Sequence, residues 1–285
     1  MLKTPAKINI GLKIINKRED GYHNLETIFY PVSLFDELEF KISTSKRNTN
    51  SVIIKSNSKI IPVDRTNICF RLVEAFFRTF RITDYYSIDL YIKKNIPVGG
   101  GLGGGSSDAA CILKYLIRYF NIDIVQRKSE ILSVALAVGS DVPFFLVSKP
   151  CFAQSRGEII SKLDEFSLKD FSVLLVNSNL HVSTKWAFET LGMKEGEVMP
   201  SELKTVRKFE PSVFGILEND FEKIVFKKYP ELERIKNELR EFGAVYSSMS
   251  GSGATMFGIF EKNNQDSLIK AFEYYKEKKY FAGIS

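Results

Sequence analysis

The sequence predicts a mixed protein of β-strands and α-helices in two domains. Apolar and polar residues alternate in segments 8–14 and 88–92, which is the period-2 pattern of half-buried strands. Segment 68–80 instead places its apolar residues on one face of a helix. The length of 285 residues suits two domains of roughly 150 or one large domain, and a fresh alternation of elements from about residue 150 favours two.

The composition is that of an ordinary folded protein, with 44% hydrophobic and 26% charged residues. The net charge of +6 suits an anionic ligand, but acidic and basic residues interleave, so a nucleic-acid partner is not expected. No segment has the apolar core of a signal peptide or a membrane span, which predicts a cytoplasmic protein without a membrane partner. Cys69, Cys111 and Cys151 fit neither a disulfide framework nor a metal site and are expected to be buried, reduced thiols.

The amino-terminal segment is expected to be a strand. Its apolar residues at even positions from 8 to 14 face the core, and the polar residues between them face the other way. Lys7 and Asn9 are therefore expected to point in the same direction. A polar insert at 43–59 is predicted to form a hairpin at the rim, without catalytic meaning.

The following elements are read from their start and stop signals. Helix 68–80 follows a cap-like entry, and the strand around 88–92 stops at Pro97, which cannot donate to a ladder. A later helix is expected to stop at Gly139, and another to run from Pro230 to Gly243.

The predicted domains are residues 1–150 and 151–285. The first contains the most unusual stretch of the chain, IPVGGGLGGGSSDAA at 96–110, which joins a strand to a helix that Ser106 and Ser107 are expected to cap. Unpaired amides at a helix amino terminus and the lack of Cβ atoms make such a loop an anion site. It lacks the lysine of a Walker A loop and the clear acidic partner of a dinucleotide loop. A flexible linker is the alternative, although a linker is not expected between such firmly bounded elements.

Three segments together resemble the motifs of the GHMP small-molecule kinases. They are PAKINIGL at 5–12, the glycine loop at 96–110 and SGSGATMF at 250–257. The resemblance implies an α+β fold with a ribosomal protein S5 domain 2-like amino-terminal domain and a ferredoxin-like carboxy-terminal domain. Segments 20–29, 140–145 and 182–188 further resemble the branch that acts on cytidine diphosphate-linked methylerythritol in the non-mevalonate route to isoprenoid precursors.

The resemblance implies that Asp141 is the catalytic base and Lys7 its cationic partner. A carboxylate can accept the proton of a substrate hydroxyl, while a nearby ammonium keeps it ionised and balances charge on the transferred phosphoryl group. The residues alone leave two alternatives open, because Asp141 could cap a helix before Pro143 and Lys7 could be a solvated strand lysine.

The resemblance also assigns ATP to the glycine loop, to a lysine before it and to a second glycine turn. These cofactor-binding residues are Lys94, Pro97, Val98, Gly99, Gly100, Gly101, Leu102, Gly103, Gly104, Gly105, Ser106, Ser107, Gly251, Ser252 and Gly253. Mg²⁺ is expected with ATP because it neutralises charge between the phosphoryl oxygens, and its protein ligand is left open.

The resemblance further implies that the small-molecule substrate contacts Asn9, Tyr22, His23, Thr184 and Phe188. Tyr22 and Phe188 would stack on the cytosine ring, and His23 would hydrogen-bond its edge. Phe188 could equally pack inward on an amphipathic helix. His181 is expected to be a surface residue.

Three functions compete at this point. The favoured one is an ATP-dependent kinase for the cytidine diphosphate-linked alcohol. The second is another GHMP kinase, of the homoserine or mevalonate type, from which segment 21–29 separates the first. The third is a nucleic-acid-binding protein with an S5-like domain, against which Lys7 and Asp141 argue. The sequence leaves the oligomeric state open.

Overall fold

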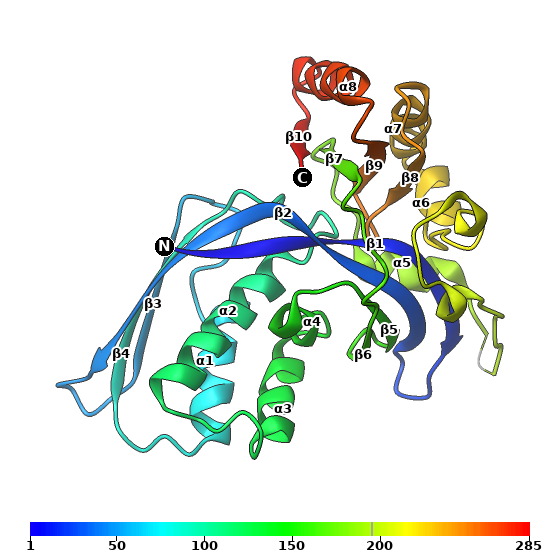
Figure 1. The fold of residues 1–285 in the computed structure, drawn as a ribbon. Helices are drawn as coiled ribbons and strands as arrows, with labels where there is room; N and C mark the ends of the chain where they lie inside the picture. The colour runs from blue at the N-terminus through cyan, green and yellow to red at the C-terminus, as the bar shows by residue number, and fades with distance from the viewer. Residues whose placement is uncertain (195) are drawn as a thin grey trace. The chain divides into compact units, whose positions relative to one another are not determined.

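The computed structural model describes residues 1–194 and 196–285, which form two compact units (Figure 1). The units are interleaved along the chain: the first contains Met1–Ala6, Phe35–Val98 and Gly103–Ser148, and the second contains Lys7–Leu34, Gly99–Leu102 and Lys149–Ser285. The last change of unit lies beside the predicted boundary near residue 150, and the domain ranges 1–150 and 151–285 themselves stay a prediction.

Two long strands, β1 (Leu2–Lys17) and β2 (His23–Thr44), contribute to both units. In the first unit, the end of β2 pairs antiparallel with β4 (Tyr86–Lys93), and β4 pairs parallel with β3 (Ser51–Ser56). The predicted hairpin within 43–59 is therefore wrong, because β3 lies on the far side of β4 from β2. A sequence pattern shows that a strand exists but not which neighbour it pairs with.

Four helices of the first unit pack on one another and lie to one side of these strands (Figure 1). They are α1 (Ile68–Thr79), α2 (Gly104–Tyr119), α3 (Lys128–Val138) and α4 (Val142–Val147). The Asn67 side chain caps α1 by accepting a hydrogen bond from the Cys69 amide at 2.8 Å, and α3 ends before Gly139 as predicted. The expected serine cap of α2 is wrong, because the helix already begins at Gly104.

The second unit contains a four-stranded antiparallel sheet in the order β10-β7-β9-β8. Its strands are β7 (Phe171–Asn177), β8 (Tyr246–Met249), β9 (Thr255–Glu261) and β10 (Phe281–Ile284). The start of β2 pairs with β5 (Cys151–Ser155), and β5 pairs with β6 (Ile159–Lys162), so that the strand order through β2 is β3-β4-β2-β5-β6.

Helices α7 (Pro230–Glu241) and α8 (Gln265–Glu277) contact the strands of the four-stranded sheet, and Figure 1 shows them beside it. Leu232, Ile235 and Leu239 of α7 are fully buried against it, which confirms the predicted helix after Pro230. The unit also contains α5 (Thr184–Leu191), α6 (Glu222–Lys228) and two short 3-10 turns, Leu203–Thr205 and Pro211–Val213.

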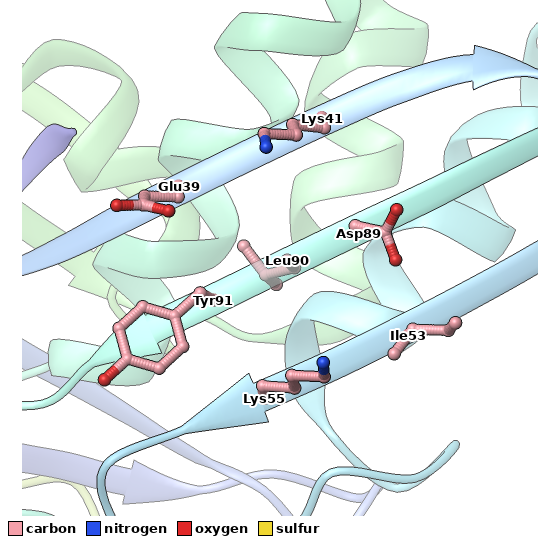
Figure 2. A pocket seen from close by; sticks show the side chains of 7 residues that line it. All are labelled: Glu39, Lys41, Ile53, Lys55, Asp89, Leu90 and Tyr91. Atoms are coloured by element: carbon pink, nitrogen blue, oxygen red, sulfur yellow. The ribbon is translucent and has the colours of Figure 1, made fainter.

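The outward face of the three strands in the first unit carries a shallow hollow of about 310 Å³, shown in Figure 2. It is lined by Glu39, Lys41, Ile53, Lys55, Asp89, Leu90 and Tyr91. None of these residues belongs to the predicted site, so the hollow is not where the sequence places the chemistry.

Within the two described ranges, no helix is both long and apolar enough to cross a lipid bilayer.

A buried carboxylate supports the strand that leads to the third motif. Glu222 of α6 accepts hydrogen bonds from Ser248 Oγ and from the Met249 amide, both at 2.8 Å, and forms an ion pair with Lys236. Its acceptor oxygens are therefore matched by donors from β8 and from α7, which fixes where β8 ends.

Glu222→Ala is expected to destabilise the protein strongly. The substitution leaves the Lys236 ammonium and the Ser248 hydroxyl without their partner, and breaking a buried ion pair costs roughly 3–5 kcal/mol. Urea unfolding measures the change in the free energy of unfolding. Glu189→Ala removes an exposed partner of Lys185 and is the control, with an expected change below about 1 kcal/mol. Equal losses in the two variants would contradict this role of Glu222.

Candidate active site

The second half of the glycine loop forms an open helix start in the first unit. Gly103 precedes α2 in the left-handed region, with a φ of 69°, and no side chain caps the helix. The amides of the first helical turn have no carbonyl of their own helix to bind, and the helix dipole adds positive potential there. Ser107 Oγ is buried and has no hydrogen-bond partner within the described part of the chain. The arrangement suits an anion with several oxygen atoms.

The first half of the loop is held in the second unit by backbone contacts. Ser250 Oγ donates to the Gly101 carbonyl at 2.9 Å, and the Thr255 amide donates to the Gly100 carbonyl at 3.2 Å. A Cβ on Gly101 would lie 2.1 Å from the Ser250 carbonyl oxygen, and its φ is 78°. Glycine is therefore required at this position, both for space and for backbone conformation.

The second glycine turn also contacts the proposed substrate residues. Ser252 Oγ lies 2.8 Å from Thr184 Oγ1, so a residue assigned to ATP and one assigned to the substrate touch directly. Ser250, which was missing from the predicted set, additionally accepts a hydrogen bond from the Asn9 amide at 3.3 Å. The Ser250 hydroxyl thus connects the first, second and third sequence motifs.

Lys7 and Asn9 lie on one face of β1, as predicted, but that face is not solvated. Lys7 is only 4% exposed and Asn9 only 3%, because β1 is covered on both faces. The Lys7 ammonium donates to Asn9 Oδ1 and lies 5.1 Å from the centre of the Phe29 ring. Asn9 Nδ2 donates to Thr27 Oγ1 at 2.9 Å, which fixes the amide orientation. The alternative of a solvated Lys7 is therefore wrong.

Asp141 belongs to the first unit and directly precedes α4. It occupies the N-cap position, but its side chain makes no capping hydrogen bond, and Pro143 lies in the first turn. The alternative in which the carboxylate serves as the helix cap is therefore not supported. Lys7, its proposed partner, belongs to the second unit.

Lys94 is held by two carboxylates in the interior of the first unit. Its ammonium forms an ion pair with Asp36 and another with Asp108, where the distance from Nζ to Oδ2 is 3.0 Å. Thr4 Oγ1 donates to Asp108 Oδ1 at 2.7 Å. Burial lowers the pKa of Lys94, but the two carboxylates outweigh that effect and raise it above its usual value. Sequence reasoning placed Lys94 near the nucleotide and missed its two partners, Asp36 and Asp108, which lie on different segments of the chain.

The aromatic residues assigned to the base pair with other partners in this structure. The His23 and Phe188 rings stack with their centres 4.7 Å apart, and Phe188 also meets Phe221 edge-on at 4.9 Å. Tyr22 is 54% exposed, and the Arg156 guanidinium lies 4.5 Å from the centre of its ring. Burial, assisted by the charge of Lys17, lowers the pKa of His23, so its ring is neutral at neutral pH and can both donate and accept.

The exposure of His181 and of the three cysteines can be compared with the expectations from the sequence. His181 is exposed, as expected. Cys69 and Cys151 are buried free thiols, whereas Cys111 is only partly buried. Burial raises the pKa of Cys111 to about 11 and that of Cys151 to about 12, so both stay protonated at neutral pH. Among the described residues, no group of three or more histidine, cysteine, aspartate or glutamate side chains could hold a metal ion.

Comparison with known proteins agrees with the motifs. The family models for the GHMP kinases N terminal domain and the GHMP kinases C terminal match residues 67–149 and 201–277. A 4-diphosphocytidyl-2-C-methyl-D-erythritol kinase from Bacteroides fragilis is 39% identical over 279 residues, covering 96% of this chain and 98% of the relative. Its namesake from Chlorobium limicola is 39% identical over 276 residues, covering 94% and 91%.

A solved structure leads to the same group. The crystal structure of 4-(cytidine 5'-diphospho)-2C-methyl-D-erythritol kinase matches with a TM-score of 0.75 and 26% identity, covering 99% of this chain and 98% of the other. The predicted α+β GHMP kinase fold is thereby confirmed. With relatives matched over nearly their whole length, the chain belongs to the 4-diphosphocytidyl-2-C-methyl-D-erythritol kinase family of the GHMP kinases.

Proposed function

We propose that this ATP-dependent kinase phosphorylates the 2-hydroxyl of 4-diphosphocytidyl-2-C-methyl-D-erythritol, a step of the non-mevalonate route to isoprenoid precursors. The observation that carries the proposal is the uncapped start of α2 after Gly103, in a chain that aligns with kinases of this name along almost its whole length. The homoserine and mevalonate alternatives are not favoured, because the curated relatives carry the name of the cytidine-linked substrate.

The glycine loop is the proposed triphosphate site. The first-turn amides of α2 and the Ser107 hydroxyl supply donors for phosphate oxygens, while the contacts of Gly100 and Gly101 with the 250–255 turn fix the approach. ATP is bound together with Mg²⁺, which enters as part of the nucleotide substrate and neutralises charge on its oxygens. The cytoplasm is the proposed location.

Asp141 and Lys7 are the proposed catalytic residues. The substrate oxygen attacks the γ-phosphorus, its proton passes to the Asp141 carboxylate, and the bond to the β-phosphate oxygen breaks to release ADP. Lys7 supplies a positive charge that favours the ionised carboxylate and offsets charge on the transferred group. The Asn9 and Phe29 contacts of Lys7 hold that charge in a fixed direction.

The cytidine is proposed to bind at Tyr22, His23 and Phe188, with Asn9 and Thr184 near the rest of the substrate. The face of Phe188 is covered by His23 in this structure, so stacking on Phe188 requires the histidine ring to move aside. A neutral His23 would then be free to offer a hydrogen bond to the base edge, since stacking alone accepts any base.

Gly101→Ala is expected to weaken ATP binding. A side chain at this φ costs about 1–2 kcal/mol before the clash with Ser250 is considered, so the KM for ATP should rise by about tenfold or more. Steady-state kinetics at saturating second substrate measures the change. Gly215→Ala, where an added Cβ meets nothing within 4 Å, is the control. An unchanged KM in a folded Gly101→Ala protein would remove the loop from the ATP site.

Asp141→Asn is expected to lower kcat by roughly 10²–10⁴, the usual worth of a general base. The side chain does not cap α4, so the amide should preserve the fold and the affinity for ATP. Single-turnover phosphoryl transfer is the measurement. Lys7→Met should also slow transfer, and the double variant should lose less than the product of the single losses because the two residues act together. A near-normal rate in Asp141→Asn would take the proposed base away.

Phe188→Ala is expected to weaken binding of the cytidine substrate by roughly 1–3 kcal/mol, the measured range for stacking of a base on an aromatic ring. Isothermal titration with the substrate measures the loss, and Phe188→Tyr, which keeps a ring, is the control. Thermal unfolding of the same variants separates the alternatives. If Phe188→Ala lowers the Tm but leaves substrate affinity intact, the ring belongs to the core with Phe221.

A further inference from the structure

We propose that Asp108, with Lys94 and Asp36, forms a buried charge cluster that positions the first turn of α2 for phosphate binding. Asp108 and Asp36 act on the nucleotide through the backbone of the loop, so they are positioning residues. The inference rests on the proposed function of the glycine loop, which it deepens by naming what holds the loop in place.

The cluster joins segments of the first unit that are far apart in the sequence and meet at the loop. Asp36 on β2 accepts hydrogen bonds from the Asn95 amide at 2.6 Å and the Ile96 amide at 2.8 Å, which fixes the chain just before the loop. Thr4 of β1 donates both to Asp108 and to the Asp36 carbonyl. Asp108, the fifth residue of α2, fixes the chain just after the loop, so both ends of the turn are tied to one ammonium.

The cluster also touches the loop itself. A Cβ added to Gly104, the first residue of α2, would lie 3.1 Å from Asp36 Oδ2 and 3.1 Å from Lys94 Nζ. The charged groups therefore pack directly against the backbone whose amides face the anion. A shift of Lys94 or Asp36 towards the loop would therefore press on this backbone, because an added Cβ at Gly104 would already be closer to both side chains than an ordinary contact.

Burying these three charged side chains lowers the stability of the fold, so a purely structural role does not account for them. The side chains of Asp36, Lys94 and Asp108 are 0%, 6% and 3% exposed. Two carboxylates share one ammonium, which leaves the cluster with a net negative charge when all three are ionised. Burial raises the pKa of Asp108 to about 6 against the opposing effect of Lys94, and the charge of Asp36 adds to the increase.

The raised pKa of Asp108 makes the stability of the fold decrease as the pH rises. A carboxyl group whose pKa is higher in the folded than in the unfolded protein adds stability below its unfolded pKa, and this contribution is lost as the pH rises through about 6. Above that pH, ionised Asp108 therefore makes the fold less stable. The other groups that face it are Thr4, Cys69 of α1 and Cys111 of its own helix, and burial keeps both thiols protonated.

A residue retained only for structure should stabilise the fold, whereas a positioning residue can be retained at a cost in stability. Asp108→Asn keeps the shape and removes the ionisable charge. We expect the variant to be at least as stable as wild type at pH 8, with a relative stability that declines towards pH 5. We also expect the Kd of the variant for a non-hydrolysable ATP analogue, measured in the presence of Mg²⁺, to rise by about tenfold. This change corresponds to the loss of one charge-assisted hydrogen bond.

The experiment measures thermal unfolding from pH 5 to 8, analogue binding by calorimetry, and kcat and KM for ATP. The matched control is Glu37→Gln, which removes a more exposed ion pair between β2 and β4, where Lys93 Nζ lies 3.3 Å from Glu37 Oε1. The expected pattern in Asp108→Asn is a higher Kd and KM, a kcat within about twofold of wild type, and no such change in Glu37→Gln.

A second variant keeps the proposal testable if Asp108→Asn does not fold. Thr4→Val removes only the hydroxyl that donates to Asp108 and should raise the Kd several-fold, with the same preserved kcat. A wild-type protein that does not bind the analogue overturns the proposed function and this inference together. Wild-type binding with an unchanged Kd in the folded variants overturns the inference alone, as does a loss of stability at pH 8 without a change in Kd.

Discussion

The proposed phosphate site depends on a stretch of backbone that must stay unpaired and yet be held still. Amides at the start of α2 can bind an anion only if no protein group binds them first. The loop is instead held through its carbonyl groups and its flanking segments. The Ser250 hydroxyl donates to the Gly101 carbonyl, and the Thr255 amide donates to the Gly100 carbonyl. The Lys94 cluster holds the segments before and after the loop. Glycine is what allows the backbone to approach Ser250 so closely.

Local patterns in the sequence predicted the elements well, and failed where the answer depended on distant segments. The alternation around β1 correctly placed Lys7 and Asn9 on one face, but the same alternation could not reveal that Thr27 and Phe29 would lie against these two side chains. The insert was predicted as a hairpin, whereas β3 pairs in parallel with β4, which follows after a helix. In each case a long-range contact decided the outcome.

The candidate site shows the same division. The glycine loop could be found because its composition is unusual, and the resemblance to GHMP kinases supplied roles for residues within recognisable motifs. Asp36 and Thr4 gave no such signal, since a single aspartate or threonine in a strand is ordinary. Ser106 and Ser107 gave a misleading one: their type suits a helix cap, but Gly103 in a left-handed conformation starts the helix earlier and leaves the Ser107 hydroxyl inside the first turn. Sequence patterns identify residue types suited to a task, and the backbone decides which task they perform.

Two groups that lower stability lie where the ligand is proposed to bind. Within the described residues, the buried Ser107 hydroxyl has no hydrogen-bond partner, and the buried Asp108 carboxyl has a raised pKa; each lowers the stability of the fold by an amount that an apolar replacement would avoid. The two groups belong to consecutive residues, Ser107 and Asp108, near the start of α2. The rest of that helix is conventional, with Ile112, Leu113 and Leu116 fully buried. Stability lost at one end of α2 is thus offset by ordinary packing along its length, and the same helix can serve both as part of the core and as a binding surface.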